Sequence, residues 1–188
     1  MTTQLSLLLG PTPHQVAGPF YPGDDAFSIR EDLAAGALGV PVFLTGSVRD
    51  QLGLPVVDAS VRLWQACATG RYDDSRDPNP APIDPNFGYH GMAVTGAGGH
   101  FSFRTVMPGE YKDTETWTRP PHLHFRVSAP GFETLTTQMY FAGNSLNEAD
   151  LILEKTPREE WSRLVVSFEE RDGVLTGHFG IVLQELFP

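Results

Sequence analysis

Apolar and polar residues alternate with the two-residue period of β-strands in several short segments of the chain. The clearest is 122–127, His-Leu-His-Phe-Arg-Val, in which the apolar residues share one face and the two histidines and the arginine share the other. The same alternation predicts four further strands, over 42–50, 59–66, 100–105 and 135–141.

The end of the chain has the pattern of a β-hairpin. Two apolar runs, 164–168 and 174–183, flank Asp172-Gly173, a dipeptide that favours the tight turns of hairpins. Residues 151–160 are the one segment compatible with a helix, and Pro157 limits its length.

These segments predict a mainly β protein of six or seven strands, mostly antiparallel because their connections are short. The 19 glycines and 16 prolines fit many strands joined by turns. We therefore expect an antiparallel β-sandwich core with long active-site loops and an extended N-terminal leader. Residues 1–41 form this leader, which we expect to pack on the core or on a neighbouring subunit. Residues 42–188 form the β-sandwich domain that carries the candidate chemistry, with a long proline-rich loop over 70–92.

Charge and composition exclude several classes of protein. The 13 Lys and Arg residues against 23 Asp and Glu residues give a formal net charge of −10, which opposes binding to nucleic acid or to an anionic membrane. The single cysteine, Cys67, excludes an intrachain disulfide. No apolar stretch approaches the roughly 18 residues of a membrane span, and the first residues do not resemble a signal peptide. We expect a soluble cytoplasmic protein with no nucleic-acid or membrane partner.

The candidate chemistry begins with the two histidines of the alternating segment. His122 and His124 lie on one face of a strand, about 6.5–7 Å apart along it, so that their rings can converge on one metal ion. A metal held by two histidines needs further ligands, and the lone Cys67 cannot provide a multi-thiolate zinc site.

Two kinds of additional ligand are available. Carboxylates from the set Asp73, Asp74, Asp113 and Glu115 would complete a two-histidine, one-carboxylate site for ferrous iron. Alternatively, Tyr72 and Tyr111, both in loops marked by glycine or proline, could bind as phenolates. A phenol titrates near pH 10, but a highly charged bound cation stabilises the phenolate, and ferric iron suits such hard anionic oxygens.

Several ordered motifs resemble the intradiol ring-cleaving dioxygenases, and the protocatechuate 3,4-dioxygenase branch most closely. The resemblance covers roughly Thr45 to Phe141, together with Ala17-Gly18-Pro19-Phe20-Tyr21 in the leader. The blocks are Leu63-Trp64-Gln65-Ala66, Gly70-Arg71-Tyr72, residues 81–87, residues 103–111 ending in Pro108-Gly109-Glu110-Tyr111, residues 117–125 containing Arg119-Pro120-Pro121-His122-Leu123-His124, and Thr137-Gln138-Met139-Tyr140-Phe141. Six blocks in the family's order are far more specific than any one of them.

The resemblance implies a mononuclear, non-haem Fe(III) site. By motif position its ligands are Tyr72, Tyr111, His122 and His124. In the family the tyrosine that matches Tyr111 leaves the iron when substrate arrives, whereas the one that matches Tyr72 stays.

The resemblance also suggests residues beyond the metal ligands. Catalytic roles are expected for Tyr111, Arg119 and Gln138. Substrate contacts are expected for Gly18, Pro19 and Phe20 of the leader and for Lys112 and Trp117, with Lys112 as a possible partner of a substrate carboxylate. The segment between Tyr111 and Arg119 is shorter than in the protocatechuate branch and lacks its Pro-Trp pair, and Pro121 replaces a small residue. These departures touch the pocket, so the ligand set is better supported than the substrate.

The implied activity is the insertion of both atoms of O2 into a catechol-type, protocatechuate-like diol, which gives a cis,cis-muconate-type diacid. The implied partners are therefore a small aromatic diol and O2, and the chain is expected to form a homo-oligomer. Three alternatives remain open: an iron-free binding or structural subunit on the same sandwich, cleavage of another diol such as catechol or hydroxyquinol, and a ferrous site completed by Asp113 or Glu115.

Overall fold

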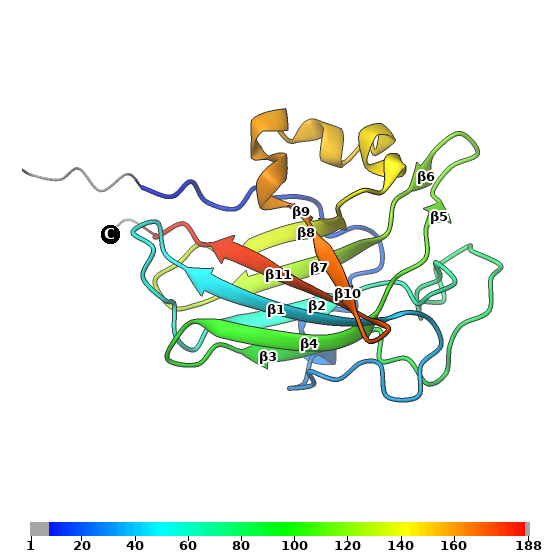
Figure 1. Ribbon diagram of the computed structural model, residues 1–188, viewed down its shortest axis with the longest axis horizontal. Helices are drawn as coiled ribbons and strands as arrows, with labels where there is room; N and C mark the ends of the chain where they lie inside the picture. The colour runs from blue at the N-terminus through cyan, green and yellow to red at the C-terminus, as the bar shows by residue number, and fades with distance from the viewer. Residues whose placement is uncertain (1–7, 187–188) are drawn as a thin grey trace, which may run out of the picture.

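The computed structural model describes residues 8–186, and its described part is mainly β (Figure 1). One sheet has the order β10 (Phe168–Arg171), β11 (Val174–Val182), β1 (Pro41–Arg49) and β4 (His100–Val106). The second has the order β3 (His90–Val94), β2 (Ser60–Trp64), β7 (His122–Ser128), β8 (Leu135–Phe141) and β9 (Val165–Val166). A separate two-stranded ribbon joins β5 (Tyr111–Lys112) to β6 (Thr118–Arg119).

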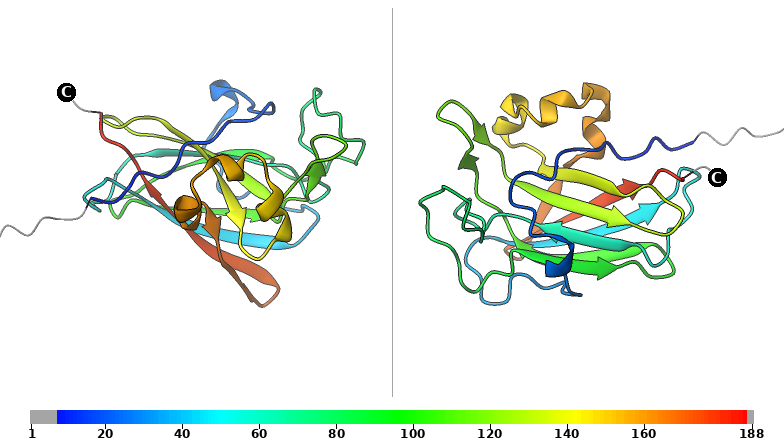
Figure 2. Two further views of the ribbon diagram at one scale, coloured as in Figure 1. Left: turned by 90° about the horizontal axis from the view of Figure 1, so that it is seen from above. Right: turned by 180° about the vertical axis from the view of Figure 1, so that it is seen from behind.

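The two larger sheets form the layers of a sandwich, as the alternation predicts (Figure 2). The strand predicted over 135–141 coincides with β8, and the histidine strand predicted over 122–127 is β7, one residue longer. Most neighbouring strands are antiparallel, but β1 runs parallel to β11 and β8 runs parallel to β9. The predicted C-terminal hairpin is confirmed as β10 and β11, and the apolar run before it contributes the short strand β9.

The helical segment expected over 151–160 is not one helix. The structure has two short 3₁₀ helices there, η3 (Leu153–Lys155) and η4 (Arg158–Arg163), preceded by η2 (Ser145–Ala149). Thr156 and Pro157 between them have ψ angles of 132° and 136°, which are extended values. The residue before a proline avoids the helical region, so the chain must leave the helix at Thr156. The long loop predicted over 70–92 is likewise shorter, because its last residues enter β3.

The sandwich core lies between the two large sheets. Leu44 of β1 and Phe103 of β4 face Leu63 of β2 and Phe125 of β7, and all four are fully buried in one apolar cluster. Most residues of the opposite parity on β1 are at least partly accessible, and Phe43 has 41% of its surface accessible. The alternation therefore selects the core face of each strand, as expected for a sandwich.

The described part of the leader packs on the sandwich of its own chain. The Thr12 amide donates to the carbonyl of Val182, and the Gln15 amide donates to the carbonyl of Thr136 in β8. The segment then crosses the outer face of the second sheet towards β3, passes through the short helix η1 (Asp24–Ala26), and inserts Leu33 into the core (Figure 2). Residues 1–7 of the expected leader lie outside the described part.

Among the helices of residues 8–186, none is long and apolar enough to span a membrane.

Neighbouring residues of β1 test the assignment of the core. Leu44→Ala removes a fully buried side chain, so we expect it to lower the free energy of unfolding by about 2–5 kcal/mol. Phe43→Ala, one residue away on the exposed face, should change it by less than about 1 kcal/mol. Chemical denaturation of the two variants measures the difference, and equal effects would contradict the assigned faces.

Candidate metal centre

Strand β7 positions the two histidines at the centre of the second sheet. It pairs with β2 on one side and β8 on the other, so that Trp64 and Gln138 lie opposite His124 and Tyr140 lies opposite His122. The apolar face of β7 enters the core, yet both imidazoles are also buried, with 2% exposure each. The histidine face is therefore a second interior, which the leader and the loops cover.

Two glycines bring the loop of Tyr72 against the strand of Tyr111. Gly70 has φ +81°, and a Cβ there would lie 2.3 Å from the carbonyl oxygen of Glu110. A Cβ on Gly109 would lie 2.4 Å from the backbone nitrogen of Gly70. Only glycine permits this left-handed conformation and this close contact of two backbones. The Gly-x-Tyr and Pro-Gly-x-Tyr blocks are thus needed together to place both phenols beside the histidines.

The four predicted ligands converge in the structure. The Tyr72 hydroxyl lies 3.1 Å from Nε2 of His124 and 3.4 Å from Nε2 of His122, and the two Nε2 atoms are 3.2 Å apart. The Tyr111 ring lies 6.0 Å from the Tyr72 ring and 5.8 Å from the His122 ring, measured between centroids. Two imidazole nitrogens and two phenols therefore surround one small volume.

Burial keeps both imidazoles neutral. It lowers the pKa of His122 and of His124 well below the ordinary value, and the positive charge of Arg119 adds to the effect in each case. Nδ1 of His122 lies 2.7 Å from the carbonyl oxygen of Pro120 and must be the protonated nitrogen, because a carbonyl only accepts. Nε2 of His122 therefore presents a lone pair to the centre, which is the form that binds a metal.

The phenols are protonated unless a cation is present. Burial raises the pKa of Tyr72 well above that of a free phenol, and the nearby Tyr111 raises it further. Burial also raises the pKa of Tyr111, although Arg119 acts in the opposite direction. Tyr72 is almost completely enclosed, whereas Tyr111 is only half-buried.

Arg119 lies at the side of this cluster and is buried. It is the last residue of β6 in the two-stranded ribbon, where it pairs with Tyr111. Its guanidinium donates to Asp150 and to Oε1 of Gln138 at 2.8 Å, and its Nη1 lies 3.2 Å from Nε2 of His122. The expected catalytic pair, Arg119 and Gln138, is thus in direct contact beside the histidines.

The leader covers the cluster from outside the sheet. Phe20 packs on the Tyr72 ring at 4.8 Å, and a Cβ on Gly18 would lie 3.3 Å from Cε1 of His124. Pro19 between them is exposed. Two of the three expected leader residues therefore touch predicted ligands directly.

Two other predicted substrate contacts, Lys112 and Trp117, adjoin Tyr111 and Arg119. Lys112 is exposed and lines, together with Tyr111, a cavity of about 300 Å³ bounded by residues 69 and 78–80. Trp117 is half-buried, and the guanidinium of Arg119 lies 5.6 Å from the centre of its ring. The indole nitrogen of Trp117 is buried and has no hydrogen-bond partner in the described chain.

The carboxylates proposed as alternative ligands do not join the histidines. Within residues 8–186 no group of three or more His, Cys, Asp and Glu side chains is arranged to hold a metal ion. Asp113 and Glu115 are exposed in the loop between β5 and β6. The oxygen donors beside the imidazoles are the tyrosines.

Three residues around the centre were not anticipated from the sequence. Trp64 stacks on the His124 ring at 4.9 Å with an interplanar angle of 10°. The Tyr140 hydroxyl accepts from Arg119 at 3.3 Å, and Asp150 forms a buried ion pair with Arg119. Trp64 and Tyr140 belong to two of the family-like sequence blocks, 63–66 and 137–141, so the sequence could have indicated them as site residues. Asp150 lies beyond the last block, and no motif indicated it.

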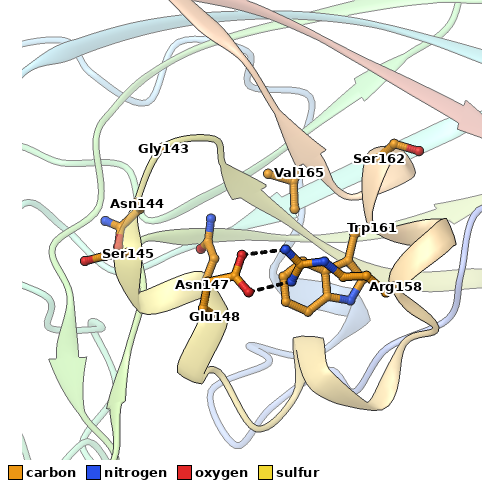
Figure 3. Close-up of a pocket in the computed structure, with 9 residues that line it drawn as sticks. All are labelled: Gly143, Asn144, Ser145, Asn147, Glu148, Arg158, Trp161, Ser162 and Val165. Carbon is orange, nitrogen blue, oxygen red and sulfur yellow. Dashed lines mark hydrogen bonds and ion pairs between the residues drawn. The ribbon is translucent and has the colours of Figure 1, made fainter.

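A separate pocket of about 490 Å³ lies between η2 and η4 and contains none of the predicted site residues (Figure 3). Glu148 and Arg158 form a two-bond ion pair across it, and the Arg158 guanidinium stacks on Trp161 at 3.9 Å. This pocket shares the η2–η3 segment with Asp150 but lies apart from the histidines.

Comparison with known proteins gives a consistent result. The dioxygenase family model matches residues 18–185. The chain is 37% identical over 180 residues to the protocatechuate 3,4-dioxygenase beta chain of Burkholderia cepacia, covering 88% of this chain and 76% of that protein. It is 32% identical to the chlorocatechol 1,2-dioxygenase of Cupriavidus pinatubonensis, covering 75% of this chain but only 58% of that protein.

A solved structure has the same fold over nearly the whole chain. The dioxygenase domain of a dioxygenase carbohydrate-binding fusion from Streptomyces sp. SirexAA-E superposes with a TM-score of 0.76 at 30% identity. The match covers 94% of this chain and 100% of that one. The similarity therefore extends beyond the segment that carries the sequence motifs.

The contact of Gly18 with His124 can be tested by adding a side chain. Gly18→Val should lift the leader, because the new side chain meets the imidazole ring. We expect the Gln15 amide, which donates to Thr136, to exchange its hydrogen at least about tenfold faster than in the unaltered chain. Gly23→Val is the matched control, since Gly23 also has a positive φ, +92°, but a Cβ there meets nothing within 4 Å. Equal exchange in both variants would contradict the contact.

Proposed function

The chain belongs to the intradiol ring-cleaving dioxygenases, and we propose that it uses Fe(III) to cleave a catechol-type, protocatechuate-like diol between its two hydroxyl-bearing carbons. The observation that carries the proposal is the convergence of Tyr72, Tyr111, His122 and His124 on one buried volume. The products are cis,cis-muconate-type diacids that contain both atoms of O2.

The donor set fits a ferric ion. Two neutral imidazoles and two phenols are available, and a trivalent cation would stabilise the phenolates that burial otherwise disfavours. When bound, ferric iron would act as a Lewis acid and as a template for the diol and O2.

The two tyrosines are placed for different roles. Tyr72 is enclosed by Phe20, and its backbone amide donates to Asp77 at 2.7 Å, so we assign it as the permanent ligand. Tyr111 is half-buried on a two-residue strand and lines the neighbouring cavity. We assign its phenolate oxygen as the group that accepts a proton from a substrate hydroxyl when the diol binds.

Arg119 and Gln138 stabilise and orient the substrate. Arg119 is a fixed cation, and its Nη1 is directed at the histidine cluster, where negative charge develops on the ring during oxygen attack. Gln138 is held by its own contacts, because its amide nitrogen donates to the carbonyl of Val16 at 2.9 Å and its oxygen accepts from Arg119. Neither side chain must reorganise as the charge forms.

The substrate is bounded by the leader and the Tyr111 loop. Gly18, Pro19 and Phe20 would form one wall, and Trp117, whose ring lies beside Arg119, would form another. Lys112 lines the same cavity as Tyr111, and its ammonium group would attract a carboxylate at the far end of the diol. This position favours protocatechuate over catechol or hydroxyquinol.

Oxygen uptake by the ferric-loaded protein tests the proposed activity. With protocatechuate, catechol and hydroxyquinol in turn, we expect equimolar consumption of O2 and diol and formation of a muconate-type diacid from at least one of them. Isotopically labelled O2 should place both oxygen atoms in the product. A ferric-loaded protein that is inert towards all three diols would overturn the proposal and favour an iron-free binding subunit.

Substitution of Lys112 tests the substrate class. Lys112→Ala should raise KM for protocatechuate by roughly tenfold, a loss of about 1.4 kcal/mol, while leaving KM for catechol unchanged because catechol has no carboxylate. Lys155→Ala, which removes another exposed lysine far along the chain, should alter neither value. Parallel increases for both diols after Lys112→Ala would exclude a role in carboxylate recognition.

A further inference from the structure

Asp150 is a fully buried carboxylate that belongs to none of the sequence motifs. It follows η2, and its side chain has no exposed surface. Its Oδ1 accepts from the backbone amides of Ile152 and Leu153 at 3.1 and 2.8 Å, which holds the turn that leads into η3. Its Oδ2 accepts from Nε of Arg119 at 3.0 Å. One carboxylate thus joins the η2–η3 segment to the arginine beside the histidines.

Two of the three guanidinium nitrogens of Arg119 are fixed by hydrogen bonds to Asp150, and the third is directed at His122. Nε and Nη2 are both within hydrogen-bond distance of Asp150, and Nη2 also donates to Gln138 and Tyr140. Nη1 is the nitrogen directed at His122. Because the guanidinium is planar, fixing Nε and Nη2 also fixes the direction of Nη1.

We propose that Asp150 is a positioning residue, which holds the guanidinium of Arg119 so that Nη1 points into the reaction centre. The catalytic consequence of this inference rests on the proposed function, whereas the contacts between Asp150 and Arg119 do not depend on it. Without the carboxylate, Arg119 would keep two neutral partners, Gln138 and Tyr140, both on Nη2. Its Nε would lose its partner, and the plane could rotate about the remaining contact.

The chain provides a matched control for the structural part of this role. Asp50 is also a buried carboxylate, with 8% exposure, and its Oδ1 accepts from the backbone amides of Leu52 and Leu54. It therefore stabilises a turn in the same way as Asp150, but it forms no ion pair within residues 8–186. Asp→Asn at either position keeps an oxygen that can accept from the backbone and removes the negative charge.

The first readout is kinetic. On the diol that the ferric-loaded protein cleaves best, Asp150→Asn should lower kcat at least tenfold and change KM by less than threefold, because Arg119 acts on charge that forms during the reaction. Asp50→Asn should leave both constants within twofold. In the Arg119→Met background, Asp150→Asn should cause no further loss of kcat. A further tenfold loss in that background would overturn the proposal.

The second readout does not depend on activity or metal. In the metal-free, ¹⁵N-labelled full chain, the Nε–H resonance of Arg119 should be protected from exchange in the unaltered protein and in Asp50→Asn. It should shift and exchange at least tenfold faster in Asp150→Asn. An unchanged resonance would overturn the proposal. An unaltered protein that is inert towards diols would instead refute the proposed function, while this resonance still reports on Arg119.

A conservative variant keeps the test decisive if Asp150→Asn does not fold. Asp150→Glu retains the charge on a longer side chain, so it should keep the Nε–H of Arg119 protected and retain more than a tenth of the original kcat. A larger loss of kcat with an undisturbed Nε–H resonance would show that Asp150 does not act through Arg119.

Discussion

The pairing of β7 with β2 and β8 is the constraint on which the site depends. A strand in the middle of a sheet presents alternate residues to opposite faces, and in β7 both faces are interior. One face supplies Leu123 and Phe125 to the sandwich core. The other presents His122 and His124 to a polar interior that the leader closes. The same hydrogen-bond ladder therefore stabilises the fold and sets the spacing of the two imidazoles.

The buried charge in the polar interior is compensated by an opposite charge. Arg119 would carry an unfavourable buried charge if it were alone, and Asp150 offsets that charge within hydrogen-bond distance. Tyr140, Gln138 and Gln15 extend the network to the leader, since the Tyr140 hydroxyl donates to Oε1 of Gln15 at 3.0 Å. The leader is thus part of the site as well as a cover for the sheet.

The sequence predicted the elements governed by local pattern and failed where distant parts of the chain decide. The alternation over 122–127 and 135–141 was sufficient for β7 and β8, and Asp172-Gly173 for the final hairpin. The pattern could not predict that β1 pairs in parallel with β11, because strand order is set by packing of the whole domain. The helix expected over 151–160 is wrong for a local reason, because Pro157 divides the segment into η3, which ends at Lys155, and η4.

In the candidate site, too, the sequence indicated the residues that belong to local motifs and missed a residue that only tertiary contacts bring in. The motifs indicated both histidines, both tyrosines, Arg119 and Gln138, and the fold brings these six residues together. The sequence did not indicate Asp150 as a site residue, because an aspartate in a short polar segment belongs to no periodic pattern. Its proposed role comes only from its contact with Arg119. Lys112 differs, because its expected contact with substrate stays a prediction: it is exposed on β5 and lines the same cavity as Tyr111.

We propose that Tyr72 binds ferric iron as a phenolate, and the visible spectrum of the iron-loaded protein is the sharpest test of this assignment. The unaltered chain should bind equimolar ferric iron and show a tyrosinate-to-iron charge-transfer band. Tyr72→Phe should weaken and shift that band. Tyr140→Phe is the matched control, because its ring is buried 6.1 Å from the His122 ring but is not assigned as a ligand, and it should leave the band in place. A colourless iron-loaded protein, or a band unchanged by Tyr72→Phe, would show that Tyr72 is not a ligand.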